Sequence, residues 1–278
     1  MKLAIGLSLT IYSTAAFAWN FEEFKYKEKC RRADALIQLP ILTGTGVQQN
    51  QAANATSYPR KYGILLYTGF DLLDVFGPLE VLHSLTFSHQ LNLSLISGHE
   101  TLDPVSNKGV AARMNPYGSS FYPSVLPTHT LKTAPKDLEV LIVPGGGWTR
   151  SPSINSTVEY VRSAYPNVKY LLTICTGAHI AALAGILDGK RATMNKQAWK
   201  ELPPRSPKVK WQPRARWVVD GNIWTSSGVT AGIDMTLEFI ECLFGEGVGR
   251  RSTTAMEHDK HADPRWDPFA VDTGSADA

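Results

Sequence analysis

The stretch that decides the fold of this chain is Tyr170-Leu-Leu-Thr-Ile-Cys-Thr-Gly-Ala-His-Ile-Ala-Ala-Leu-Ala-Gly-Ile-Leu187. It starts as an apolar run that favours a β-strand and continues after Gly177 as an alanine-rich segment that favours a helix. A strand that runs straight into a helix strains the residue at the junction, whose side chain then stands clear of both elements. This is the geometry of a nucleophile elbow, with the thiol of Cys175 in place of a hydroxyl.

Cys175 by itself has two interpretations. The backbone N–H groups that open the following helix point at the thiol, and they can lower its pKa and stabilise an oxyanion. A free cysteine in an apolar run is, however, commonly a buried structural residue. The motifs elsewhere in the chain have to decide between these two interpretations.

Strands and helices alternate along residues 61–245. Apolar runs predict strands at 62–67, 91–96, 138–143 and 168–174, and a hairpin at 216–225. Helices are predicted from about Pro78, which fits a first helical turn, and at 154–165 and 230–244. Residues 98–137 hold scattered turn residues and predict short strands and loops. Fully apolar strands between helices indicate an α/β domain with a mostly parallel sheet.

Three unusual junctions follow strands of this sheet: Asp74 after 62–67, Gly145–Gly147 after 138–143 and Cys175 after 168–174. Ligands of such sheets bind at the carboxyl ends of the strands, so we expect these residues to converge on one site. Asp74 could instead only cap a helix, and the glycines could form only a turn. Asp71 competes with Asp74 for the role of acid but lacks the Asp-x-x-x-Pro spacing.

Four motifs in this order resemble the ThiJ/PfpI superfamily, a branch of the class I glutamine amidotransferase-like fold. They are Leu73-Asp-Val-Phe-Gly-Pro-Leu-Glu-Val81, Val143-Pro-Gly-Gly-Gly147, Ile174-Cys-Thr-Gly-Ala178 with Ala184-Gly-Ile-Leu-Asp-Gly-Lys-Arg-Ala-Thr193, and Thr225-Ser-Ser-Gly-Val-Thr-Ala-Gly-Ile-Asp234. Asp-x-x-x-Pro together with Cys-Thr-Gly is most similar to the isonitrile hydratase-like branch. It also resembles the sensor domains of AraC-type regulators, but only 33 residues follow Gly245, which argues against a DNA-binding domain.

The resemblance implies a flavodoxin-like three-layer sandwich, usually a homodimer. Cys175 is then the nucleophile and Asp74 the acid beside it. Backbone N–H groups near Gly146 and Thr176 would form an oxyanion cradle. The residues expected to form the cradle and pocket are Gly146, Gly147, Thr176 and Gly177.

Two positions depart from other branches of the superfamily. Thr176 follows the cysteine where peptidase-like members have His, which argues against a protease. Asn195 stands near a position where many relatives have His, so a Cys–His pair is not carried over. The resemblance therefore implies a Cys–acid site, and the seven His and three Cys show no metal-ligand spacing.

The chemistry expected of such a site is attack of a thiolate on a small electrophile, with one proton shuttle and neither metal nor cofactor. An isonitrile would give a thioimidate, which water converts to an N-substituted formamide. Two alternatives stay open: a glyoxalase- or deglycase-like reaction on an α-oxoaldehyde, and a non-enzymatic ligand-binding or redox-sensing protein. For sensing, an exposed thiol of low pKa would be prone to oxidation.

The ends of the chain predict a secretory protein. Residues 1–18 read as a signal peptide, with Lys2, an apolar run and the cleavage site Ala16-Phe-Ala18. Three sequons, at Asn54, Asn92 and Asn155, favour glycosylation and secretion. Residues 19–60 form a polar extension and residues 246–278 a polar tail. The net charge of +3, with mixed signs, indicates neither a nucleic-acid partner nor a membrane anchor after cleavage.

The three cysteines leave one thiol over in an oxidising compartment. If Cys175 is reactive, Cys30 and Cys242 could pair and tie the extension to the domain. Cys242 lies in an apolar helix, so a buried free thiol is the alternative.

Overall fold

The computed structural model describes residues 58–109, 111–151 and 154–272. The expected signal peptide at 1–18, most of the extension at 19–60 and the sequon at Asn54 lie outside the described residues. The same holds for Cys30, and with it the expected Cys30–Cys242 pairing. Cys242 itself is disulfide-bonded, whereas Cys175 is free.

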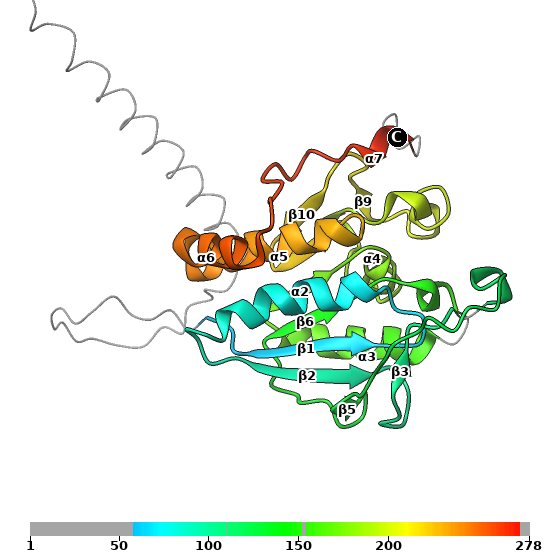
Figure 1. Ribbon diagram of the computed structural model, residues 1–278. Coiled ribbons are helices and arrows are strands. Elements are labelled where there is room, and N and C mark those ends of the chain that lie inside the picture. The colour runs from blue at the N-terminus through cyan, green and yellow to red at the C-terminus, as the bar shows by residue number, and fades with distance from the viewer. Residues whose placement is uncertain (1–57, 110, 152–153, 273–278) are drawn as a thin grey trace, which may run out of the picture. The chain divides into compact units, whose positions relative to one another are not determined.

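A seven-stranded sheet in the order β10-β11-β7-β6-β1-β2-β5 forms the centre of the domain (Figure 1). All neighbouring strands pair in parallel except β10 and β11, which form an antiparallel hairpin. The strands are β1 (Lys61–Leu66), β2 (Asn92–Ser97), β5 (His129–Thr130), β6 (Val140–Val143), β7 (Tyr170–Thr173), β10 (Trp217–Asp220) and β11 (Ile223–Ser226). The apolar runs at β6 and β7 are buried along their whole length, as fully covered parallel strands require.

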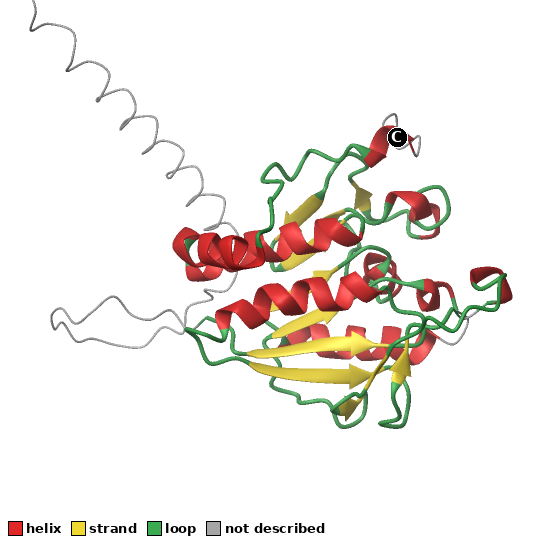
Figure 2. Cartoon of the chain, in the orientation of Figure 1, coloured by secondary structure: helices red, strands yellow, loops and turns green. Residues whose placement is uncertain are grey.

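Helices cover both faces of the sheet, so the domain is the predicted three-layer α/β sandwich (Figures 1 and 2). One layer contains α2 (Leu72–Leu85), α5 (Val229–Phe244) and α6 (Glu246–Met256), with α5 packed against the other two. The other layer contains α3 (Asn155–Ala164) and α4 (Gly177–Leu183), which pack against each other. The central strand β6 lies between β1 and β7, which brings together the carboxyl ends of these three strands.

Short elements complete the domain, and residues 98–137 hold only such elements, as predicted. β3 and β4 form a two-stranded antiparallel pair, and β8 and β9 a parallel one. The short elements are β3 (Val105–Ser106), η1 (Ala112–Met114), β4 (Ser124–Val125), η2 (Gly147–Arg150), η4 (Tyr165–Asn167), β8 (Arg191–Ala192), η5 (Lys196–Ala198), η6 (Pro203–Arg205), β9 (Lys210–Trp211) and α7 (Phe269–Asp272).

Helix α2 begins earlier than the sequence predicted. Pro78 was expected in the first turn, but α2 starts at Leu72 and Pro78 lies inside it. Proline has no N–H to donate, so the carbonyl of Asp74, four residues earlier, loses its normal helical partner at this point. The earlier start places Asp74 in the first turn of the helix, where the chain leaves β1.

The polar tail that the sequence predicted from residue 246 contains regular structure in its described part, residues 246–272. It contains α6 and then a strap, residues 257–270, held by ion pairs to the domain. His258 Nε2 lies 2.7 Å from Asp234 Oδ1, and Asp267 Oδ2 lies 3.5 Å from Lys196 Nζ. Pro264 accepts the backbone N–H of Arg216 at 2.7 Å, beside the edge strand β10. Within the described part of the chain, no helix has the length and apolar character needed to span a bilayer.

Candidate active site

Cys175 lies at the sharp turn between β7 and α4, and its backbone φ is +56°. A non-glycine residue rarely adopts this conformation, which is typical of a strained elbow. The side chain is only 2% exposed. The strand–cysteine–helix junction predicted from residues 170–187 is therefore present, with a buried thiol.

Asp74 and the glycine loop after β6 are joined directly. The N–H of Gly145 donates to Asp74 Oδ2 at 2.8 Å, and the carbonyl of Gly145 accepts the N–H of Asp71 at 3.1 Å. A Cβ on Gly145 would come within 2.6 Å of Thr176 N and 2.8 Å of Cys175 Cβ. Only a glycine lets the three strand ends approach this closely.

The expected oxyanion cradle is not built from free N–H groups of the glycines. Gly146 donates to Thr176 Oγ1 at 3.0 Å, Gly147 to the Gly69 carbonyl at 2.8 Å, and Gly177 to the Ile174 carbonyl at 2.8 Å. These contacts hold the loops together. The N–H of Thr176 faces the sulfur of Cys175 instead.

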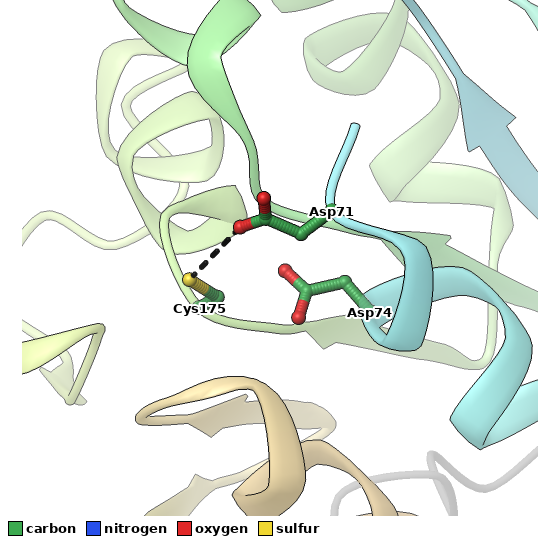
Figure 3. Close-up of side chains that lie close together, drawn as sticks. All are labelled: Asp71, Asp74 and Cys175. Atoms are coloured by element: carbon green, nitrogen blue, oxygen red, sulfur yellow. Dashed lines mark hydrogen bonds between the residues drawn. The ribbon is translucent and has the colours of Figure 1, made fainter. Parts of the chain in front are cut away.

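Asp71, which lacks the Asp-x-x-x-Pro spacing, also lies beside Cys175. The thiol of Cys175 donates to Asp71 Oδ2 at 3.8 Å, as Figure 3 shows. One oxygen of Asp71, one of Asp74 and the sulfur all lie within 4.8 Å of one another. Asp-x-x-x-Pro spacing selected Asp74 alone. The signal that could have found Asp71 is its position three residues earlier, where the first turn of a helix faces the same side.

The two carboxyl groups differ in their protonation. Burial, and then the charge of Asp71, raise the pKa of Asp74 from 3.8 to about 8, so Asp74 is mostly protonated at pH 7. Burial also raises the pKa of the partly exposed Asp71, but its hydrogen bond from Cys175 and the nearby cation of Arg150 act against the rise. Of the pair, Asp71 therefore carries the negative charge.

Cys175 is a neutral thiol at rest, contrary to the low pKa expected from the elbow. Burial, followed by the charges of Asp74 and Asp71, raises its pKa well above 9. The N–H of Thr176 and the side chain of Asn195 act in the opposite direction but do not outweigh these effects. Helix α4 has only seven residues and contributes little dipole. The exposed, low-pKa thiol that redox sensing would use is absent at Cys175.

Asn195 is a neighbour of the Cys175 thiol. Its Oδ1 accepts the N–H groups of Gln197 at 2.9 Å and Ala198 at 3.3 Å, capping η5. The amide NH₂ is thereby oriented to donate to the Cys175 sulfur, the contact that acts to lower the thiol pKa. Asn195, which stands near the His position of other branches of the superfamily, is thus a direct neighbour of the nucleophile.

His179 is a buried residue that faces other charges. Burial, together with the cations of Arg205 and Arg150, lowers its pKa to about 4, so its imidazole is neutral at pH 7. The two arginines are joined by Glu201, which accepts from Arg150 Nε at 3.1 Å and Arg205 at 3.0 Å. Trp148, after the glycine loop, stacks edge-on against His99 at 5.7 Å between ring centroids.

The trio Asp71, Asp74 and Cys175 also has the spacing of a metal site, which the sequence did not predict. Binding a cation would require the thiol and Asp74 to lose their protons. Both groups hold them to high pH, which makes the trio a poor ligand set near neutrality.

A cysteine elbow beside buried carboxyl groups, on a mostly parallel sheet between two helical layers, defines a cysteine-elbow protein of the α/β class. The DJ-1/PfpI family matches residues 60–242, and the chain belongs to this family. The resemblance to ThiJ/PfpI proteins is therefore confirmed.

Three relatives illustrate the range of the family. The isonitrile hydratase of Pseudomonas putida is 33% identical over 197 residues, which are 70% of this chain and 77% of that protein. The transcriptional regulator GbdR of Pseudomonas aeruginosa is 29% identical over 119 residues, or 43% of this chain and 31% of the regulator. A crystal structure of a ThiJ/PfpI family protein from Pseudomonas syringae superposes with a TM-score of 0.61 at 25% identity, covering 83% of this chain and 92% of that one.

These relatives correct the secretory interpretation of the N-terminus. They support the family, but none of them supports a signal peptide, secretion or glycosylation, and one is by name a transcriptional regulator. The apolar start and the sequons are short patterns that arise readily by chance. The match to GbdR also means that the expected absence of a nucleic-acid partner is not supported.

Proposed function

We propose that the protein is a cysteine-dependent hydratase that adds water to a small electrophile of the isonitrile type. The observation that carries this proposal is the position of the buried Asp74 carboxyl group beside the Cys175 thiol at the strained elbow. Asp74 Oδ2 accepts the Gly145 N–H, so the acid proton sits on Oδ1, a buried atom with no partner among the described residues. An acid in this state can give its proton to a bound substrate.

Hydration of an isonitrile, R–N≡C, requires the acid of Asp74 and the thiol of Cys175 to act on the same carbon. Asp74 protonates the terminal carbon, which makes it electrophilic, and the sulfur of Cys175 forms a bond to the same carbon as its S–H bond breaks and the thiol proton moves to a base beside the sulfur. The product is a thioimidate, R–N=CH–S. Water then adds to that carbon, the C–S bond breaks, and the N-substituted formamide leaves. The relationship to an isonitrile hydratase at 33% identity supports this choice of electrophile.

Turnover of tert-butyl isocyanide by the purified protein, followed as formamide release, tests the proposal. Cys175→Ser should abolish turnover while its thermal unfolding stays close to that of the wild type. Turnover that is unchanged in the serine variant would refute the nucleophile. Methylglyoxal in the same assay tests the α-oxoaldehyde alternative, because those carbonyls need the same thiol and acid.

A second candidate function is binding of a small ligand without turnover. The observation that favours it is the match to a transcriptional regulator, together with a thiol that is neutral and buried at rest. Saturable binding of tert-butyl isocyanide or methylglyoxal by calorimetry, with no product formed, would favour this function over the hydratase.

The homodimer implied by the family resemblance belongs to the proposal as well. Leu73 and Phe76 of α2 are 46% and 41% exposed and offer apolar surface for a second copy. Sedimentation velocity of the wild type and of a Phe76→Glu variant would test whether this face joins two copies.

A further inference from the structure

Attack by the Cys175 thiol leaves one proton without an acceptor. Asp74 also contacts the thiol, but it cannot take the proton, because burial raises its pKa to about 8 and it is already protonated near pH 7, while its second oxygen accepts the N–H of Gly145. The phenol of Tyr67 is bound to the Pro144 carbonyl, and burial raises its pKa well above 10. Arg150 is a permanent cation, and Asn195 does not titrate. Some other group must accept the proton.

Asp71 has the contacts that this acceptor needs. Its Oδ2 already accepts the hydrogen bond of the thiol at 3.8 Å. It occupies the N-cap position of α2, yet its side chain makes no capping hydrogen bond, so the carboxylate is not engaged with the helix. Its own N–H is fixed by the Gly145 carbonyl at 3.1 Å, which holds the residue against the elbow.

We propose that Asp71 is a second catalytic carboxylate of this site, which takes the proton from the Cys175 thiol as the sulfur attacks. Asp74 is then the acid and Asp71 the base, two carboxyl groups with different roles set by their surroundings. The assignment to turnover rests on the proposed hydratase function. The proton transfer itself concerns only the thiol and Asp71.

The cycle balances with these two groups. In the first half, the Sγ–H bond breaks and its proton moves to Asp71, the sulfur bonds to the isonitrile carbon, and the Asp74 proton moves to that carbon. In the second half, water adds to the thioimidate carbon and gives a proton to Asp74, while Asp71 gives its proton to the nitrogen. The C–S bond then breaks, and the hydroxyl proton returns to the sulfur through Asp71.

Alkylation of Cys175 by iodoacetamide tests the transfer without any assumption about the substrate. If Asp71 receives the proton, the reactive thiolate is formed by an internal exchange, and its population does not depend on pH. The wild-type rate should then stay flat from about pH 6 to about pH 7.5, below the pKa of Asp74 at about 8. The groups around the pair are Asp74, Tyr67 and the cation of Arg150, and the raised pKa values of Asp74 and Tyr67 keep both protonated through most of this window.

In Asp71→Asn the proton must leave to solvent, so the rate should rise about tenfold per pH unit over the same range. Asp71→Glu, which keeps a carboxylate, should restore the flat profile, and Asp74→Asn should keep it although both asparagine variants lose turnover. Asp71→Ser serves the same purpose if the asparagine variant does not fold, as judged by circular dichroism.

A flat profile that persists without the carboxylate at position 71, or a wild-type rate that itself rises tenfold per pH unit, overturns the proposal. A role for Asp71 in stability alone would change the melting temperature but not the slope. If the wild type does not turn over tert-butyl isocyanide, the proposed function fails, whereas the alkylation profiles still decide the role of Asp71.

Discussion

Asp74 Oδ2 accepts the backbone N–H of Gly145 at 2.8 Å, and this contact decides which oxygen of a buried acid carries the proton. The carboxyl group is fully buried. With one oxygen occupied by a donor, the proton lies on the other, Oδ1, which is buried and has no hydrogen-bond partner among the described residues. Figure 3 shows the carboxyl group of Asp74 beside Asp71 and Cys175. The acid thus lies in the first turn of α2, after β1, and is held by the loop that follows β6.

Stability should fall as the pH rises toward 8, and Asp74 should account for the slope. Its pKa is raised from 3.8 in the unfolded chain to about 8 in the fold, so the folded state binds one more proton between these values. That contribution is complete below about pH 4 and is lost as pH rises through about 8, at up to about 1.4 kcal/mol per pH unit. Urea unfolding at several pH values should show a shallower slope in Asp74→Asn. An equal slope in the two proteins would contradict the buried, protonated acid.

The rate of turnover should also depend on the titration of Asp74. Because the acid must be protonated to donate, kcat should fall in the wild type above about pH 8. Asp74→Asn should lower kcat by about 10²- to 10³-fold and remove this upper limb. Stopped assays with tert-butyl isocyanide across the pH range measure both effects. An upper limb that survives in the asparagine variant would assign the titration to another group.

Gly145→Ala should damage the site more than the fold. The new Cβ would lie 2.7 Å from Asp74 Oδ2 and 2.8 Å from Cys175 Cβ, so the acid and the nucleophile must be pushed apart. We expect a loss of about 1–3 kcal/mol in unfolding free energy and at least a tenfold loss of kcat. Gly228→Ala is the matched control, because a Cβ there meets nothing within 4 Å. Equal effects of the two substitutions would show that the close approach at Gly145 is unimportant.

The sequence predicted the sheet and the elbow because both depend on local patterns. The apolar runs at Val140–Val143 and Tyr170–Thr173 and the small residues after Cys175 are each sufficient in their own segment. The protonation of the site could not be predicted in the same way. Whether the elbow lowers or raises the thiol pKa depends on burial and on Asp71, whose contact with Cys175 spans 104 positions of the chain. Which acceptors the N–H groups of the glycines bind depends likewise on the loops that fold next to them.

The contacts of the C-terminal strap could not be predicted from the sequence for a related reason. Its residues are polar, but their partners are buried charges on other elements, such as Lys196 for Asp267. Periodicity does not reveal pairs of this kind. The polar composition of residues 246–278 therefore predicted only a polar tail over the surface, whereas the ion pairs of His258 and Asp267 fasten the strap to named partners on the domain.

The pair between Asp267 and Lys196 should be important for stability. Both side chains are almost fully buried, and Lys196 lies next to Asn195 at the site. Asp267→Asn leaves the buried cation without its counter-ion, which costs about 3–5 kcal/mol. Glu100→Gln, which breaks the exposed pair with Lys132, should leave the unfolding free energy almost unchanged, because solvent screens this pair. Chemical denaturation measures both, and similar losses in the two variants would argue against a structural role for the strap.

Asn195→His should convert the resting thiol toward a thiolate. The amide of Asn195 donates to the sulfur but carries no charge, whereas an imidazolium at this position would stabilise the anion and lower the thiol pKa by about 1–3 units. The substitution also removes the cap that Oδ1 provides for η5, at a cost of about 1 kcal/mol. Iodoacetamide labelling of Cys175 at pH 6 should be at least tenfold faster than in the wild type. Asn195→Ala, which loses the same cap without adding a cation, is the control. Faster labelling in the alanine variant as well would attribute the change to a loosened loop and not to charge.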